Sequence, residues 1–125
     1  MVLPYLHFNG NCEEAFNFYA ECFGGKITFL SRLNNDPSNP VMHATVMLTE
    51  TGGVSGSDSD PPEPLPEKYE ILVHFKTRDE IEQVFKKLSQ GGTNIGEFTP
   101  HPPPDDKSGA AYVIDKYGYT WFLNV

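Results

Sequence analysis

Hydrophobic and polar positions change their spacing along the chain in an order that occurs twice. Residues 2–8 (VLPYLHF) form an extended, aromatic-rich run that is typical of a strand. Residues 12–23 carry apolar side chains at helical spacing, and Gly24 and Gly25 can end that helix. The next two runs, KITFLSRL and VMHATVMLTE, alternate as strands do, and the short GGVSGSDS is a candidate for a last strand.

The second half of the chain repeats this order. Residues 69–76 (YEILVHFK) predict a strand, residues 81–88 repeat the helical spacing, and Gly91 and Gly92 are expected to close the helix. The runs TNIGEFT, AAYVID and YTWFLNV predict three further strands.

Helix-start signals support the repeat. Asn11 and Thr77 are each followed three residues later by a glutamate, which is the spacing of a capping box, and 66 positions separate the two. The sequence therefore predicts an α+β fold of tandem βαβββ modules, with mostly antiparallel mixed sheets around a cleft. Module one covers about residues 1–58, an acidic and Pro-rich linker about 57–68, and module two about 69–125, within a single domain of residues 1–125. A generic α+β domain with accidental internal similarity is the alternative.

Charge and composition narrow the possible partners. The chain of 125 residues has a formal net charge of −8, which argues against nucleic acid and anionic membrane surfaces. No apolar run approaches about 20 residues, and no secretory signal is visible at the N-terminus. Cys12 and Cys22 would lie roughly 15 Å apart on one helix, too far for a disulfide, so a cytoplasmic location is expected.

Three segments carry a family resemblance: PYLHFNGNCEEAFNFYAECFGG, VMHATVML and DKYGYTWFLNV. They resemble the PhnB-like branch of the vicinal oxygen chelate superfamily, which includes glyoxalase, bleomycin-resistance proteins and extradiol dioxygenases. The resemblance implies paired βαβββ modules, a cleft that binds a small organic molecule, and a homodimer. It identifies the fold better than a reaction, because this scaffold hosts several chemistries.

The same resemblance bears on metal binding. Active members usually hold a divalent metal through His and Glu side chains, and the corresponding positions here fall on Pro4, Glu70, Phe122 and the stretch near Gly53 to Ser57. Only Glu70 offers a metal ligand, whereas a catalytic metal needs about three. The usual metal site, and hence any cofactor, is not predicted.

Strand alternation supplies candidate site residues. Glu70 and His74 share one face of their strand, opposite Ile71, Val73 and Phe75, and His43 would join them if its face is the inner one. A buried carboxylate near imidazoles can act as a general base, so Glu70, His74 and His43 are the candidate catalytic residues. A satisfied polar contact or a dimer contact is the structural alternative.

The remaining side chains are assigned by alternation, by their flat aromatic surface in the case of Phe8, Phe122 and Tyr112, and by alignment with the resembled family in the case of His7. The expected ligand-binding residues on the cleft faces are Phe8, Thr45, Leu72, Tyr112, Phe122 and Asn124. His7 is expected on the helix side of the first strand, and His101 in a solvated loop. Four aromatic residues are assigned to the core: Phe16, Tyr19, Phe85 and Trp121.

Three functions remain open. The first is a small-molecule-binding protein without the usual metal site. The second is a divalent-metal-dependent lyase, isomerase or dioxygenase with relocated ligands such as His43, Glu70 and His74, and the third is a non-catalytic structural or regulatory dimer. A methyltransferase with the usual nucleotide-binding sheet is not expected, because the turn Asn9-Gly10-Asn11 lacks the Gly-rich pattern that follows the first strand of that sheet.

Overall fold

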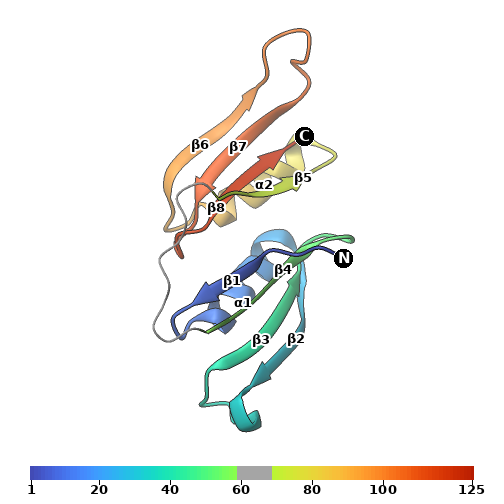
Figure 1. The fold of residues 1–125 in the computed structure, drawn as a ribbon. Helices are drawn as coiled ribbons and strands as arrows, with labels where there is room; N and C mark the ends of the chain where they lie inside the picture. The colour runs from blue at the N-terminus through green and yellow to red at the C-terminus, as the bar shows by residue number, and fades with distance from the viewer. Residues whose placement is uncertain (59–68) are drawn as a thin grey trace. The chain divides into compact units, whose positions relative to one another are not determined.

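The computed structural model describes residues 1–58 and 69–125, and it divides the chain into two compact units, Met1–Pro64 and Leu65–Val125 (Figure 1). The first unit contains β1 (Tyr5–Phe8), α1 (Cys12–Phe23), β2 (Lys26–Arg32), a 3-10 turn η1 (Leu33–Asn35), β3 (Val41–Met47) and β4 (Gly53–Asp58). The second contains β5 (Ile71–His74), α2 (Arg78–Leu88), β6 (Thr93–Pro100), β7 (Gly109–Ile114) and β8 (Thr120–Asn124). The predicted α+β fold of two βαβββ modules is confirmed. None of the described helices is long and apolar enough to span a membrane.

Both units arrange their strands in the same way. The sheet orders are β1-β4-β3-β2 and β5-β8-β7-β6. The first strand of each unit runs parallel to the last, and the other neighbours are antiparallel because short connections join them. Each helix lies along one face of its own sheet (Figure 1). We call the opposite face of each sheet its open face.

In strand β1, the two faces are the reverse of those predicted for Phe8 and His7. Leu6 and Phe8 are buried beneath α1, and the Phe8 ring meets Phe16 edge-on with ring centroids 5.7 Å apart. The expectation that Phe8 faces the cleft is therefore wrong. His7 is exposed on the open face, not on the helix side. The two large apolar side chains take the core positions, and alternation then places Tyr5 and His7 outside.

Strand β3 follows the predicted alternation except at its start. Ala44 and Val46 are buried towards α1, while His43 and Thr45 lie half-buried on the open face, as alternation predicts. Met42 is exposed instead of sharing the face of Ala44. The pairing of β2 with β3 shifts register at this point, so Met42 occupies an extra position in the ladder.

Helix α1 is capped from a distant strand. Asn11 is the N-cap residue, but its side chain makes no capping hydrogen bond, so the predicted capping box does not form. Instead, the backbone N–H of Cys12 donates to the Asp58 carboxylate at 3.0 Å, and the N–H of Val41 donates to its other oxygen at 3.0 Å. Asp58 therefore joins the end of β4 to α1 and β3 at once. At its other end, α1 stops at Gly24, whose φ of 70° is left-handed, as predicted.

Helix α2 is capped from its own sequence. The Thr77 side chain accepts from the backbone N–H of Glu80 at 3.2 Å, which confirms the predicted capping interaction. The helix ends at Leu88 with Ser89 as its C-cap, earlier than the glycine pair suggested. Gly91 then adopts a left-handed φ of 74° in the following turn.

The last hairpin is organised by a buried aspartate. Asp115 accepts hydrogen bonds from the backbone N–H groups of Tyr117 and Tyr119 at 2.8 and 3.0 Å. Its second oxygen accepts from the indole N–H of Trp121 at 2.8 Å, and both side chains are almost fully buried. The sequence DKYGYTW thus forms a turn in which one carboxylate satisfies three donors.

Candidate functional site

The open face of the first unit gathers aromatic and imidazole rings from three strands. The Tyr5 ring stacks on the His43 ring with centroids 5.7 Å apart, and the Phe29 ring lies 5.6 Å from the same imidazole. The Tyr5 hydroxyl and His43 Nδ1 are 3.3 Å apart, within hydrogen-bonding reach. His7 lies beside Tyr5 on β1 at 5.3 Å. We call Tyr5, Phe29 and His43 the ring cluster.

Two hydroxyl groups border the ring cluster. Thr45 Oγ1 and Ser55 Oγ are 2.7 Å apart and form a hydrogen bond across β3 and β4. Strand pairing places Tyr5 opposite Ser55, and Thr45 opposite both Ser55 and Phe29. Side by side across the open face lie the Tyr5 ring, the two hydroxyl groups of Ser55 and Thr45, and the Phe29 ring. The face thus presents flat apolar surface beside hydrogen-bonding groups.

On the open face of the second unit, side chains likewise lie side by side across neighbouring strands. Leu72 of β5, Phe122 of β8 and Tyr112 of β7 are paired neighbours across the sheet. Leu72 is 59% exposed, while Phe122 and Tyr112 are half-buried. In the next row, His74 Nδ1 lies 3.0 Å from the Asn124 amide oxygen, within hydrogen-bonding distance. The four predicted binding residues of this unit therefore lie on one face, and their binding role remains a prediction: Leu72, Tyr112, Phe122 and Asn124.

The predicted catalytic residues are more exposed to solvent than expected. Glu70 precedes the first paired residue of β5 and is exposed, so the expectation of a buried carboxylate is wrong. His74 is exposed and His43 is half-buried. Among residues 1–58 and 69–125, no three His, Cys, Asp or Glu side chains gather into a group that could hold a metal ion. The relocated ligand set therefore gains no support in the described part of the chain.

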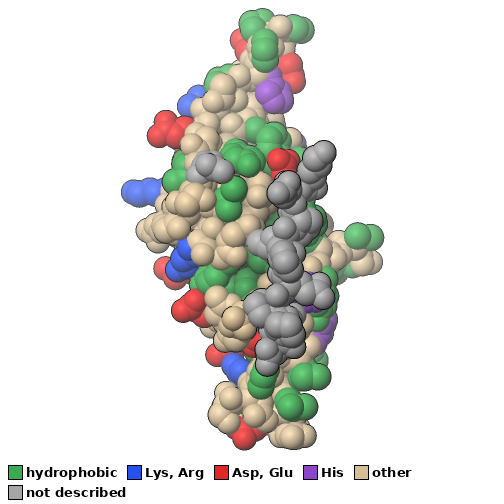
Figure 2. Space-filling view, turned by 60° about the vertical axis from the view of Figure 1, so that its left-hand side comes forward, with side chains coloured by type: hydrophobic (Ala, Val, Ile, Leu, Met, Phe, Trp, Pro, Cys, Tyr) green, Lys and Arg blue, Asp and Glu red, His purple; other side chains and the backbone are tan. Residues whose placement is uncertain are grey.

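His101 lies in the loop between β6 and β7, where it was expected. Its Nδ1 is 3.1 Å from an Asp105 carboxylate oxygen, and this bond, followed by that of Ser108, lowers the pKa of Asp105. Figure 2 shows histidine, acidic and hydrophobic side chains together at this end of the second unit. All of these loop side chains are exposed, so the loop offers no enclosed site.

Sequence reasoning missed the two exposed rings of the first open face. Tyr5 is 44% exposed and Phe29 52% exposed. The signal for Tyr5 was present in the run LPYLHF, because Leu6 and Phe8 form a stronger apolar set than Tyr5 and His7. The register shift in β2 between Ile27 and Phe29 leaves no trace in the sequence pattern, so the face of Phe29 could not be read from alternation.

Comparison with known proteins identifies the family. The family model described as 3-demethylubiquinone-9 3-methyltransferase matches residues 1–124. The chain belongs to this family. None of the curated proteins matches the chain.

Solved structures agree with this assignment. A PhnB protein from Bacillus cereus is 31% identical, with a TM-score of 0.78 over 98% of this chain and 96% of that one. Protein PA1353 from Pseudomonas aeruginosa is 25% identical, with a TM-score of 0.83 over 99% of this chain and 96% of that one. A glyoxylase/bleomycin resistance protein/dioxygenase domain from Frankia sp. EAN1pec is 10% identical and covers 100% of this chain and 95% of its own, with a TM-score of 0.75. This last likeness shows the fold alone, which is the glyoxalase-type fold, while the family model and the Bacillus cereus protein confirm the PhnB-like resemblance.

The methyltransferase in the family's description does not follow from this fold. The two described sheets are mixed and mostly antiparallel, whereas the usual nucleotide-binding methyltransferase sheet is doubly wound and parallel. The turn after β1 is Asn9-Gly10-Asn11, and it leads into a helix whose first N–H is bound by Asp58. That turn lacks the Gly-rich pattern that follows the first strand of the usual nucleotide-binding sheet.

Proposed function

We propose that this chain binds a small planar organic molecule on the open face of its first sheet, using aromatic and hydroxyl contacts and no metal ion. The ring cluster carries the proposal. Two large aromatic side chains about half exposed and in contact with one imidazole are an uncommon feature of a solvated sheet face. A planar ligand would cover this apolar surface and stack on the rings.

The neighbouring polar groups restrict the ligand further. The Thr45–Ser55 pair and the Tyr5 hydroxyl supply donors and acceptors at the border of the rings. A ligand with one or two hydrogen-bonding groups on a flat apolar body fits this arrangement. The open face of the second unit, taken by itself, offers groups of the same two kinds: apolar side chains at Leu72 and Phe122, and the polar His74–Asn124 pair.

A thermal-shift screen of planar aromatic fragments bearing a hydroxyl, carbonyl or amide group tests the proposal. Binders are expected to raise Tm as their concentration increases. Phe29→Ala should remove most of that shift, whereas the matched control Leu33→Ala, which removes a 45%-exposed side chain from η1, should leave it unchanged. A flat response to the whole library would contradict the proposal, as would equal effects of the two variants.

One observation favours acid–base chemistry as a second candidate function. The Tyr5 hydroxyl lies 3.3 Å from His43 Nδ1, so the pair could pass a proton to or from a bound ligand. Of the three predicted catalytic residues, His43 is therefore the strongest candidate for a general acid or base, because a tyrosine hydroxyl lies beside its ring. His43→Gln should abolish any turnover found with a binding fragment while retaining binding, and loss of binding alone would argue against catalysis.

The expected homodimer forms part of the same proposal. Exposed apolar side chains remain on the first unit outside the ring cluster, among them Leu33 and Met42. Contact with a second copy would cover some of this surface. Sedimentation at micromolar concentration tests the dimer, and a monomer would contradict it without affecting the ligand proposal.

A further inference from the structure

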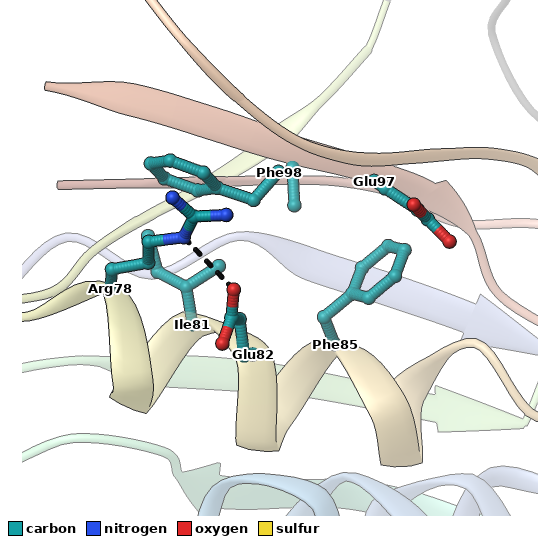
Figure 3. Close-up of a pocket in the computed structure, with 7 residues that line it drawn as sticks. Arg78, Ile81, Glu82, Phe85, Glu97 and Phe98 are labelled. Atoms are coloured by element: carbon teal, nitrogen blue, oxygen red, sulfur yellow. Dashed lines mark hydrogen bonds and ion pairs between the residues drawn. The ribbon is translucent and has the colours of Figure 1, made fainter. Parts of the chain in front are cut away.

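A pocket of about 200 Å³ lies on the helix side of the second unit, away from its open face (Figure 3). Helix α2 supplies one wall and strand β6 the other, and Ala111 of β7 contributes from the sheet. The lining residues are Arg78, Ile81, Glu82, Phe85, Glu97, Phe98 and Ala111. Ile81 and Ala111 are buried and form an apolar floor, while both glutamates lie at the exposed rim.

The helix sequence explains why this space is open. With the N-caps Asn11 and Thr77 aligned, Phe16 of α1 corresponds to Glu82 of α2, and Tyr19 to Phe85. In the first unit, α1 packs across β2, β3 and β4, and both aromatic side chains are fully buried. In the second unit, α2 packs on β7 and β8, so the space beside β6 remains a pocket.

The edge strand turns two successive side chains towards the pocket. Gly96 pairs with Tyr112 and Thr99 with Ala110, so β6 has one residue more than β7 across this stretch. Such a bulge interrupts the normal alternation of side chains. Glu97 and Phe98 can therefore line the same pocket, which adjacent residues of a regular strand would not do.

One end of the pocket already shows how it holds a cation. The Arg78 guanidinium lies over the Phe98 ring, 4.4 Å from its centroid, and Arg78 Nε is 2.9 Å from a Glu82 carboxylate oxygen. Figure 3 shows this guanidinium between the ring and the carboxylate. An aromatic face and a carboxylate together stabilise a positive charge.

The other end offers a second carboxylate and a second ring. Glu97 and Phe85 both line the pocket at the end away from Arg78 in the view of Figure 3. Among the described residues, no ion pair involves Glu97. Two glutamates and one arginine leave the pocket with one net negative charge at neutral pH, which a monovalent cation would neutralise.

We propose that this pocket binds a small organic cation with a short apolar body, such as a primary alkylammonium. The ammonium would contact the Glu97 carboxylate and the Phe85 ring, and the alkyl chain would extend inward towards the apolar floor of the pocket. The volume lies below the roughly 300–1,000 Å³ of drug-sized ligand sites, so the cation must be small. Its exposed rim limits the affinity to about the millimolar range.

Titration of the ¹⁵N-labelled chain with n-butylammonium chloride, followed by amide chemical shifts, tests this site. Saturable shifts are expected at residues 78–85 and 96–98. The neutral n-butanol, which has the same chain length, should bind at least about threefold more weakly because it lacks the charge. Equal binding of the alcohol would overturn the proposal, as would shifts confined to other parts of the chain.

Three variants locate the charge recognition. Glu97→Gln should weaken n-butylammonium binding about threefold or more, and Phe85→Leu, which keeps apolar volume but removes the ring face, by about twofold to fivefold. Arg78→Met should strengthen it about threefold, because the competing cation is removed. The control Glu50→Gln changes an exposed carboxylate of the first unit and should leave binding unchanged. Unchanged affinity in both Glu97→Gln and Arg78→Met would refute the charge-based site.

Discussion

The two units share a strand plan and differ in what their helices bury. Helix α1 buries Cys12, Phe16 and Tyr19 against its sheet, whereas the corresponding positions of α2 hold Arg78, Glu82 and Phe85. The difference lies on the helix side, where polar replacements leave a pocket beside β6. The plan of the sheet therefore survives a large change in how its helix is packed, because the remaining apolar positions of α2 (Ile81, Val84 and Leu88) still bury their side chains.

The largest expected contrast is between two aromatic side chains at equivalent helix positions. Tyr19→Ala removes a fully buried ring and should lower the free energy of unfolding by about 4 kcal/mol. Phe85→Ala removes a half-buried ring at the wall of a pocket and should cost about 1.5 kcal/mol. Urea denaturation followed by far-UV circular dichroism measures both. Equal losses would show that the two helices are packed alike.

A second contrast is between Asp58 and Asp115, each of which accepts several hydrogen bonds within its own unit. Asp115→Ala leaves the buried Trp121 N–H and two backbone N–H groups without their acceptor, and should cost about 3 kcal/mol. Asp58→Ala removes an acceptor from two backbone N–H groups in a half-buried position and should cost about 2 kcal/mol. The same denaturation experiment compares them, and a larger loss for Asp58→Ala than for Asp115→Ala would reverse the expected order.

The helix caps give a smaller and more selective test. Thr77→Ala should destabilise the chain by about 1 kcal/mol, because the Thr77 side chain caps the Glu80 N–H. Asn11→Ala should have little effect, since the Asn11 side chain makes no capping hydrogen bond. Matched denaturant midpoints would reveal this difference. A loss at Asn11 as large as that at Thr77 would restore the two capping boxes that the sequence suggested.

The smallest expected effect concerns the pH dependence of the first unit. Burial raises the pKa of the Cys12 thiol from 9.0 to about 12, and the Asp58 carboxylate adds to the rise. The folded state therefore holds this proton more tightly than the unfolded state, so stability is unaffected below pH 9 and falls as the pH rises towards 12. Allowing for solvent screening, the loss between about pH 8 and about pH 10 should be about 0.7 kcal/mol. Cys12→Ala should remove this part of the pH dependence, and an unchanged slope in the variant would contradict the assignment.

Much of the fold could be predicted from the sequence because its signals are local. Helical spacing, the left-handed Gly24 and the alternation in β3, β5 and β8 all act within a few residues. The features that were not predicted depend on contacts between residues far apart in the sequence. The Asp58 carboxylate caps a helix 46 positions away, and the register shifts in β2 and β6 arise from pairing with neighbouring strands.

The candidate site shows the same division. Alternation correctly placed four side chains on one face, because β5 and β8 pair without a register shift: Leu72, His74, Phe122 and Asn124. Phe8 and His7 were misplaced, because the first strand was aligned through the family resemblance and not through its strongest apolar pair, Leu6 and Phe8. Glu70 was expected to be buried, but it lies just outside the paired length of β5.

The proposed binding of a planar molecule to the open face is tested most directly by mapping a fragment from the thermal-shift screen onto the ¹⁵N-labelled chain. The expected result is saturable amide shifts on β1, β2 and β3 around Tyr5, Phe29 and His43, lost in Phe29→Ala and retained in Leu33→Ala. Shifts confined to the helix side of either sheet, or an unchanged map in Phe29→Ala, would contradict the proposal.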